Sequence, residues 1–302
     1  MLPGWLRVPA AAGLRAVPWE GDWEALPNDA DLAACRVFVP PYMGPASNAD
    51  LSRGMPALEL VQTLTAGVDG IAERLPRGAV LCGAAGVHDA STAELAVGLM
   101  IAAQRGIDVA ASDLPEGVWR HERRRSLADS RVLVVGWGGV GRAIGERLAG
   151  FECEVVAVGR SARLEGVCQV QGADELDTLL PGADIVVVAV PLSAQTRGMF
   201  DADRLARMAD GALLVNVARG PVVDTDALVA QASTGRLRAA LDVTDPEPLP
   251  PAHPLWTCPG VLITPHLGGN SAAFPPRAQR MLDRQLLRWA AGEALRGVVA
   301  RD

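Results

Sequence analysis

Very few side chains in this sequence of 302 residues are suited to acid–base chemistry near neutral pH. Its 28 basic residues are all arginine, because no lysine occurs anywhere in the chain. The absence of lysine excludes Schiff-base enzymes and phosphate loops of the G-x-x-x-x-G-K-S/T type. Histidine, the side chain that titrates closest to neutrality, occurs only as His88, His121, His253 and His266.

Polar groups directly follow three of the apolar, strand-like runs. Arg219 follows one run in Asn-Val-Ala-Arg-Gly, Asp242 ends the next run with Glu247 in the proline-rich loop after it, and His266 follows the last run and precedes a Gly-Gly turn. Ligands of α/β sheets bind at the carboxyl ends of strands, and a guanidinium suits a carboxylate through two parallel hydrogen bonds. Singly, Arg219 also fits a surface salt bridge, Glu247 an exposed loop acid and His266 a structural histidine. Their common position after strands favours one shared site.

The segment 132–148 contains a G-x-G-x-x-G motif formed by Gly136, Gly138 and Gly141. Gly136 allows the tight turn, Gly138 lets the backbone approach a pyrophosphate, and Gly141 allows close packing of helix on strand. Glycines of this spacing also occur in unrelated turns, but here they follow a predicted strand and open a predicted helix. We therefore predict dinucleotide binding.

The end of the next predicted strand indicates which dinucleotide binds. NAD-binding units carry an acidic residue there to bond the ribose hydroxyls, whereas this sequence has Gly159-Arg160-Ser161. An arginine suits a 2′-phosphate through charge-assisted hydrogen bonds. We predict NADP as the cofactor and NAD as a weaker one. The alternative is that Arg160 only begins a solvated loop.

Short apolar runs alternate with helical patterns over most of the chain. Continuous apolar runs are typical of strands covered on both faces. This alternation predicts an α/β fold with two doubly wound, Rossmann-like domains, parallel sheets and a cleft between the domains. The predicted strands are 35–39, 60–64, 78–82, 131–136, 154–159, 184–190, 212–217, 238–243 and 260–264, and the shorter predicted helices are 141–151, 201–209 and 224–233.

Two longer helical patterns suggest the domain plan. Residues 91–110 predict a helix that crosses between domains, with Ser91 as N-cap and Glu94 completing a capping box. Residues 276–295 predict a last helix, with no strand after it, that packs back on the N-terminal domain. We predict a discontinuous, flavodoxin-like substrate-binding domain and a dinucleotide-binding Rossmann domain. Their boundaries are 1–92 with 275–302, and 93–274.

Composition limits the partners. A net charge of −7 disfavours nucleic acid, and the basic run 119–126 fits a solvated surface loop. An N-terminal segment broken by prolines, and no apolar run of about 18 residues, disfavour a signal peptide and a membrane span. The five cysteines are widely spaced and include no C-x-x-C pair, as in proteins of reducing compartments. We expect a cytoplasmic protein without a metal site.

Together these segments resemble the D-isomer-specific 2-hydroxyacid dehydrogenases, which include phosphoglycerate, glyoxylate/hydroxypyruvate and formate dehydrogenases. The resemblance extends over essentially the whole chain. It rests on Thr-Ala-Gly-Val-Asp (65–69), Ala-Glu-Leu (93–95), Gly-Trp-Gly-Gly-Val-Gly (136–141), Pro-Leu…Thr (191–196), Asn-Val-Ala-Arg-Gly (216–220), Asp-Val…Glu-Pro (242–248), His-Pro-Leu-Trp (253–256) and Thr-Pro-His-Leu-Gly-Gly (264–269). The Gly159-Arg160 pair replaces the family's commoner acidic residue and resembles the NADP-dependent glyoxylate/hydroxypyruvate reductase branch.

The resemblance implies the reduction of a small 2-oxo acid to an R-2-hydroxy acid, with the hydride supplied by the nicotinamide. Arg219 would clamp the carboxylate and the carbonyl oxygen of the substrate, and His266 would donate a proton to that oxygen. Glu247 would orient His266 and favour its protonated form. The backbone amides of Ala66 and Gly67 would bind the substrate carboxylate.

The resemblance also implies a set of cofactor contacts and a homodimer. Asp242 would bond the nicotinamide carboxamide, Gly139 and Val140 would line the pyrophosphate, and Thr196 and Val217 would flank the cofactor. The other residues expected at the cofactor are Gly136, Gly138, Gly141, Gly159, Arg160, Ser161, Pro191, Ala218 and Gly268. The homodimer is expected because the long helix and the loop after it resemble the family's dimer contact.

One alternative belongs to a different class of function. Some members of this superfamily act as transcriptional corepressors, so a dinucleotide-sensing interaction protein with little turnover is the rival of the enzyme. The lack of long anion-binding or regulatory extensions disfavours an allosterically controlled phosphoglycerate enzyme, and formate or phosphonate specificity is less expected. The choice of 2-oxo acid depends on pocket shape, which loops 40–48, 65–69 and 88–90 would set.

Overall fold

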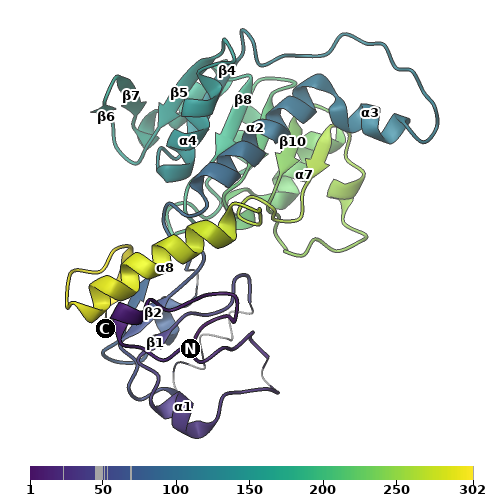
Figure 1. The fold of residues 1–302 in the computed structure, drawn as a ribbon. Coiled ribbons are helices and arrows are strands. Elements are labelled where there is room, and N and C mark those ends of the chain that lie inside the picture. Colours follow the sequence, from purple (N-terminus) through teal and green to yellow (C-terminus); the bar gives the residue numbers. More distant parts are fainter. Residues whose placement is uncertain (23, 45–49, 51, 53, 69, 302) are drawn as a thin grey trace. The chain divides into compact units, whose positions relative to one another are not determined.

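A computed structural model describes the chain except residues 23, 45–49, 51, 53, 69 and 302 (Figure 1). Contacts divide the chain into two compact units. The first unit comprises Met1–His88 and Ala272–Asp302, and the second comprises Asp89–Ser271. The C-terminal segment therefore belongs to the same unit as the N-terminal segment.

The bounds of the elements are as follows. The helices are α1 Asp29–Ala33, α2 Asp89–Arg105, α3 Ile107–Asp113, α4 Gly139–Leu148, α5 Leu176–Leu179, α6 Ala202–Arg207, α7 Thr225–Ser233 and α8 Phe274–Ala290. The strands of the first unit are β1 Val37–Phe38, β2 Leu60–Gln62, β3 Val80–Cys82 and β12 Val298–Arg301. Those of the second unit are β4 Arg131–Val135, β5 Glu154–Val158, β6 Arg163–Glu165, β7 Cys168–Gln171, β8 Ile185–Val188, β9 Leu213–Asn216, β10 Arg238–Leu241 and β11 Val261–Ile263.

The second unit is built on one sheet with the strand order β11-β10-β9-β8-β4-β5-β7-β6. Successive side chains of a strand point to opposite faces, and in β8 all four are buried. On one face the strands pack against residues of α2 and α4, and on the other against residues of α5, α6 and α7. Burying an aliphatic side chain stabilises the fold by about 1.5–3 kcal/mol, so these two-sided strands hold the unit together.

The first unit has a smaller sheet with the strand order β1-β2-β3-β12. Residues Phe274, Ala278, Leu282 and Leu286 recur every four positions along α8, which places them on one helix face. All four are buried in one cluster with side chains of β1, β2 and β3. The opposite face of the sheet is covered by a second cluster that includes Trp19 and Met55.

The predicted α/β fold with two domains and mainly parallel sheets is confirmed, with corrections at the sheet edges. Every predicted strand is present, within a shorter range. Sequence analysis missed β6, β7 and β12, and the prediction of no strand after the last helix was wrong. Strands β6 and β12 pair antiparallel with their neighbours. The hairpin β6–β7 escaped prediction because β6 is polar and exposed, with Leu164 69% exposed.

The long helix predicted over 91–110 is also corrected. It begins at Asp89, so Ser91 lies in its first turn instead of at its N-cap. It ends at Arg105 because Gly106 adopts φ +66°, a left-handed conformation that glycine tolerates, and α3 follows. Among the described residues no single helix meets the length and hydropathy of a membrane span, and only α2 with α3, bent by 66°, meets them as a pair.

Candidate active site

The sheet of the second unit brings most of the predicted site residues to one edge. Strands β4, β5 and β8–β11 run parallel, so their carboxyl ends lie along the same side of the sheet. Ligands of open α/β sheets bind at this edge. The predicted residues that follow these strands are Gly136 after β4, Gly159 and Arg160 after β5, Pro191 after β8, Arg219 after β9, Asp242 after β10 and His266 after β11.

His266 and Glu247 form the central contact of this edge. Nδ1 of His266 lies 2.6 Å from Oε1 of Glu247, and the side chains are 23% and 38% exposed. The hydrogen bond from His266 lowers the pKa of Glu247 below its usual range, although burial acts in the opposite direction. The charges of His266 and Arg219 and a backbone hydrogen bond from Thr244 lower this pKa further. Arg219, Glu247 and His266 therefore share one electrostatic environment.

A buried carboxylate holds the turn that carries His266. Asp242 is 2% exposed, and its oxygens accept hydrogen bonds from the Thr264 hydroxyl at 2.7 Å and from the Leu267 and Gly268 amides at 2.7 and 2.8 Å. The Asp242 carbonyl accepts the His266 amide at 2.8 Å. His266 itself has φ +53°, a conformation that costs free energy for a side chain of this size. Sequence analysis expected Asp242 at the nicotinamide and did not predict that it holds this turn.

Arg219 is positioned by a buried amide and by a glycine. Asn216 accepts the Ala218 amide at 3.0 Å and donates to the Arg219 carbonyl at 3.1 Å. A Cβ atom on Gly220 would lie 1.9 Å from the Thr244 carbonyl oxygen. Only glycine therefore lets the segment leading to Glu247 pack against the turn after Arg219. The Arg219 guanidinium donates to the Ala218 carbonyl at 2.7 Å.

The glycine motif has the geometry of a phosphate-binding turn. Gly136 has φ +108°, and a Cβ there would lie 2.5 Å from the Ala189 carbonyl oxygen. A Cβ on Gly141 would lie 1.9 Å from the Gly136 carbonyl oxygen, so helix and turn are in close contact. At Gly138 a Cβ would meet no atom within 4 Å. This open space before the N-terminus of α4 fits the pyrophosphate of a dinucleotide.

The loop after β5 contains two arginines with different surroundings. Arg160 is exposed. Arg163 donates to the Trp137 carbonyl within the glycine motif at 3.2 Å and pairs with Glu165 at 2.9 Å. Glu165 also pairs with Arg142 of α4 at 2.7 Å. The hydrogen bonds from these two arginines lower the pKa of Glu165. Sequence analysis missed this bracing role of Arg163 because the hairpin that carries Glu165 was not predicted.

The remaining predicted cofactor residues lie in the second unit as well. The Thr196 hydroxyl donates to the Pro191 carbonyl at 2.6 Å and closes the turn after β8. Val217 and Ala218 are 8% and 6% exposed beside Arg219. The others are Gly139 and Val140 in the first turn of α4, the exposed Ser161, and the buried Gly268.

The predicted substrate-binding amides lie in the first unit. The Thr65 hydroxyl donates to the Gly67 carbonyl at 2.6 Å, which closes the turn that contains Ala66. In the described part of the chain, the N–H groups of Ala66 and Gly67 make no hydrogen bond. His88, from the predicted loop 88–90, bonds the Leu64 carbonyl at 2.7 Å. Residue 69 and the part of loop 40–48 from residue 45 on lie outside the described residues.

Comparison with known proteins identifies relatives over most of the chain. Residues 97–268 match the family described as D-isomer specific 2-hydroxyacid dehydrogenase, NAD binding domain. The glyoxylate reductase of Thermofilum pendens is 33% identical over 266 residues, covering 84% of this chain and 78% of the relative. The glyoxylate reductase/hydroxypyruvate reductase of Mus musculus is 34% identical over 248 residues, covering 79% and 76%.

Solved structures agree with this similarity. A D-isomer specific 2-hydroxyacid dehydrogenase from Xanthobacter autotrophicus Py2, in complex with NADPH and MES, is 34% identical with a TM-score of 0.77 and covers 89% of this chain and 85% of its own. An NADPH-dependent glyoxylate/hydroxypyruvate reductase from Sinorhizobium meliloti, in complex with NADP and malonate, is 26% identical with a TM-score of 0.80. That alignment covers 99% of this chain and 95% of the other.

Proposed function

Since the chain belongs to the D-isomer specific 2-hydroxyacid dehydrogenases, NAD(P)-dependent oxidoreductases, we propose that it reduces a small 2-oxo acid to an R-2-hydroxy acid with NADPH. Glyoxylate and hydroxypyruvate are the proposed substrates, as the names of its relatives suggest. The observation that carries the proposal is the His266–Glu247 contact in the field of Arg219. A proton donor and a fixed cation near one another suit the polarisation of a carbonyl.

Each of these side chains has a separate task in the proposed reaction. Arg219 binds the substrate carboxylate and carbonyl oxygen through its planar guanidinium. Glu247 holds Nδ1 of His266, which leaves Nε2 as the ring nitrogen that donates a proton to the carbonyl oxygen. The N–H groups of Ala66 and Gly67 are proposed to bind the substrate carboxylate. When bound, the nicotinamide supplies the hydride.

The proposed cofactor preference is NADP over NAD. Strand β5 ends at Val158, and Gly159-Arg160 follows where an NAD-binding unit carries an acid. Arg160 is exposed and suits the 2′-phosphate. The NADPH and NADP complexes of the related structures support this preference.

We propose residues 93–274 as the dinucleotide-binding domain and the rest of the chain as the substrate-binding domain. The cytoplasm stays the predicted compartment.

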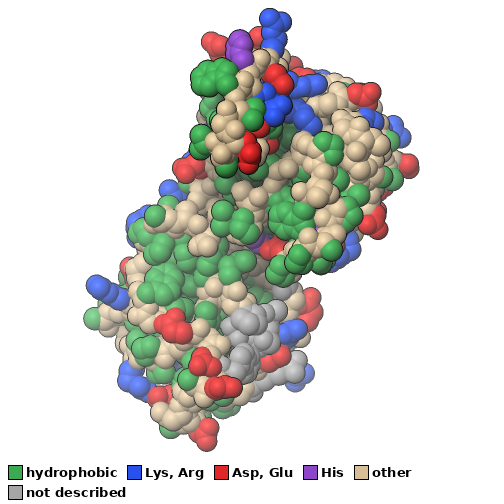
Figure 2. All heavy atoms as spheres, turned by 90° about the vertical axis from the view of Figure 1, so that its right-hand side faces the viewer, with side chains coloured by type: hydrophobic (Ala, Val, Ile, Leu, Met, Phe, Trp, Pro, Cys, Tyr) green, Lys and Arg blue, Asp and Glu red, His purple; other side chains and the backbone are tan. Residues whose placement is uncertain are grey.

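We also propose a homodimer formed through the arm of residues 106–126. This segment extends from the sheet of the second unit in Figure 1 and faces the viewer in Figure 2, with hydrophobic, basic and acidic side chains on its surface. Trp119 is 93% exposed and Leu114 79% exposed. Large exposed apolar side chains gathered on one segment are typical of a protein interface.

The decisive test of the enzyme is an assay of glyoxylate, hydroxypyruvate, pyruvate and phenylpyruvate with NADPH and with NADH. We expect oxidation of NADPH with one or more of these acids. Binding of NADPH without oxidation would instead support the dinucleotide-sensing interaction protein.

For the dimer, Trp119→Asp should yield a monomer in sedimentation analysis, whereas Val167→Asp, at a fully exposed valine of the β6–β7 turn, should not. An unchanged dimer in Trp119→Asp would exclude the arm as the contact.

A further inference from the structure

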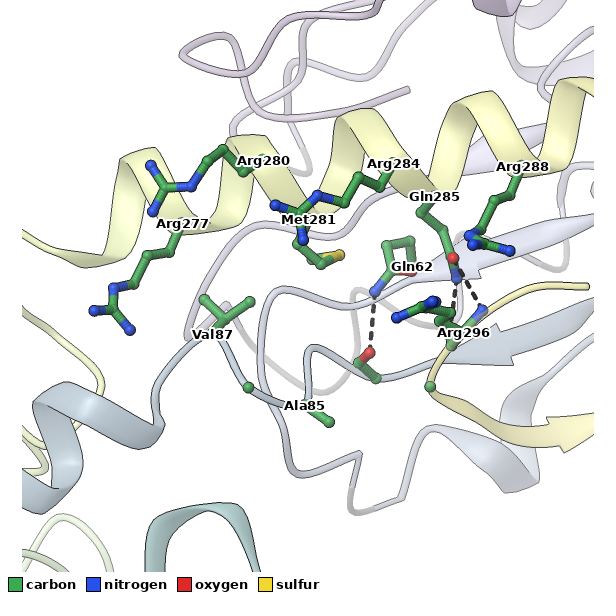
Figure 3. Close-up of a pocket in the computed structure, with 13 residues that line it drawn as sticks. Gln62, Ala85, Val87, Arg277, Arg280, Met281, Arg284, Gln285, Arg288 and Arg296 are labelled. Atoms are coloured by element: carbon green, nitrogen blue, oxygen red, sulfur yellow. Dashed lines mark hydrogen bonds between the residues drawn. The ribbon is translucent and has the colours of Figure 1, made fainter. Parts of the chain in front are cut away.

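The first unit contains a pocket of about 350 Å³ beside α8. Its wall is formed by one face of α8, by the segment after β3 and by the segment before β12. Figure 3 shows these segments around Gln62 of β2. None of the residues proposed to bind substrate or cofactor lines this pocket. It is therefore independent of the proposed function.

Five arginines surround the pocket: Arg277, Arg280, Arg284, Arg288 and Arg296. Positions three and four apart share one face of a helix, and like charges at this spacing destabilise it. Of the five, only Arg288 pairs with a carboxylate among the described residues, at 3.3 Å from Glu293. In a chain of net charge −7, this arrangement concentrates positive charge in a concave site, which attracts anions.

A buried acceptor in the same pocket lacks a donor. Gln62 is 0% exposed, and its Nε2 donates to the carbonyls of Thr63, Cys82 and Gly83 at 3.0, 3.2 and 3.3 Å. These contacts fix the orientation of the amide, because only the NH₂ group can donate to carbonyls. Oε1 of Gln62 has no hydrogen-bond partner. A buried acceptor of this kind is satisfied when a donor from a ligand or a water reaches it.

We propose that this pocket binds a small organic anion with more than one negative charge and a hydroxyl group. The guanidinium groups of Arg284 and Arg296, which Figure 3 shows near Gln62, bind the oxyanion through paired hydrogen bonds. The hydroxyl donates to Oε1 of Gln62. A phosphate monoester and a polycarboxylate share this chemistry, and the volume of the pocket is in the range of small-molecule sites.

Calorimetric titration of the full chain, saturated with NADPH, tests the proposal with two matched pairs of probes. Glycerol 3-phosphate is compared with propyl phosphate, and citrate with tricarballylate, because the second member of each pair lacks the hydroxyl. We expect one pair to bind with a stoichiometry of one, and its hydroxylated member to bind more tightly. The pair that binds identifies the anionic group. Equal affinity within the binding pair would overturn the role of Gln62, and no saturable binding at millimolar concentration would overturn the site.

Two double variants test whether the anion binds in this pocket. Arg284→Ala with Arg296→Ala should weaken the affinity at least about tenfold, since two charge-assisted contacts are lost. Arg7→Ala with Arg77→Ala removes the same charge from exposed positions of the same unit outside the pocket and should leave the affinity unchanged. Equal weakening in both double variants would contradict the site. Arg284→Gln alone replaces the first double variant if that variant does not fold. NADPH binding and turnover are measured in separate assays, so a failure of the proposed function would be distinguished from a lack of anion binding in this pocket.

Discussion

Nδ1 of His266 lies 2.6 Å from Oε1 of Glu247, and this contact joins two loops that follow different strands of one sheet. A bond of this length to a carboxylate fixes the plane of the imidazole ring. It also commits Nδ1 to Glu247 and leaves Nε2 as the ring nitrogen proposed to donate to the substrate. The contact therefore joins two loop residues into the unit that we propose as the proton donor.

Replacement of the proposed proton donor, His266, should affect turnover much more than cofactor binding. We expect His266→Gln to lower kcat by about 10²- to 10⁴-fold, the usual contribution of a positioned general acid. The Kd for NADPH, measured by fluorescence titration, should stay within about twofold, because no cofactor role is proposed for this ring. His121→Gln, at an exposed histidine, is the control and should retain full activity. Unchanged kcat in His266→Gln would exclude the proposed donor.

The lowered pKa of Glu247 predicts how stability depends on pH. A carboxyl group with a lower pKa in the folded state stabilises the fold above its unfolded pKa and loses that contribution as the pH falls through the folded pKa. Glu247 should therefore stabilise the protein at neutral pH, and this contribution should decrease as the pH falls from the unfolded pKa of about 4.3 through the lower pKa of the folded state.

The variant Glu247→Gln checks this dependence. Because Glu247 is more than a third exposed, solvent screening limits the effect to less than about 1 kcal/mol. Denaturant unfolding at a series of pH values should show the variant less stable near neutrality, with the two proteins converging in acid. A stability difference that is the same at every pH would show that the carboxylate charge is not responsible.

Asp242 should be needed for the turn that carries His266. In Asp242→Asn one carboxylate oxygen becomes an NH₂ group, which cannot accept a hydrogen bond from a backbone amide. We expect a loss of about 1–3 kcal/mol in the free energy of unfolding, together with a lower kcat because the imidazole is displaced. Asp226→Asn, at an acid in the first turn of α7, is the control. Full stability in Asp242→Asn would contradict this role.

Alanine variants at Gly138 and Gly150 test the effect on cofactor binding separately from the effect on stability. A Cβ at either position would meet no atom within 4 Å, so neither Gly138→Ala nor Gly150→Ala should lower the Tm by more than a few degrees. Only Gly138 faces the proposed pyrophosphate site. Gly138→Ala should therefore weaken NADPH binding at least about tenfold through lost backbone approach, and Gly150→Ala should bind NADPH normally. Equal affinities would place the pyrophosphate elsewhere.

Arg160 should discriminate between the two dinucleotides. Arg160→Ala removes the cation proposed to bind the 2′-phosphate, so we expect the Kd for NADPH to rise at least about tenfold and the Kd for NADH to stay unchanged. Arg147→Ala, at the last turn of α4, makes the same change of charge and should alter neither affinity. A parallel loss of both dinucleotides in Arg160→Ala would point to loop folding instead of phosphate recognition.

The buried strands and the glycine motif were predictable because their signals are local. Apolar runs such as β8 are buried on both faces, and that burial needs an uninterrupted stretch of aliphatic residues. The turn at Gly136 needs a glycine for its positive φ and for its contact with Ala189. The position of Arg219 and His266 after strands followed from the same reasoning, because parallel strands end at one edge of a sheet.

The hairpin β6–β7 and the antiparallel strand β12 were not predictable in this way. Strand β6 is polar and exposed, so it carries no apolar pattern, and β12 is held by pairing with β3, which precedes it by more than 200 residues. The bracing of the glycine motif by Arg163 depends on that hairpin and was missed with it.

The sequence by itself determined the fold class, the dinucleotide motif and the identity of the residues at the candidate site. Each of these depends on residue type and local spacing. The resemblance implied that Glu247 orients His266, and the tertiary structure shows the contact between them. Only the tertiary structure decided that Asp242 holds the turn of His266 and that Gly220 lets the Thr244 carbonyl pack closely. It also gathered arginines of α8 and the segment before β12 around Gln62. These contacts join segments far apart along the chain, and their distances depend on how strands and helices pack in three dimensions.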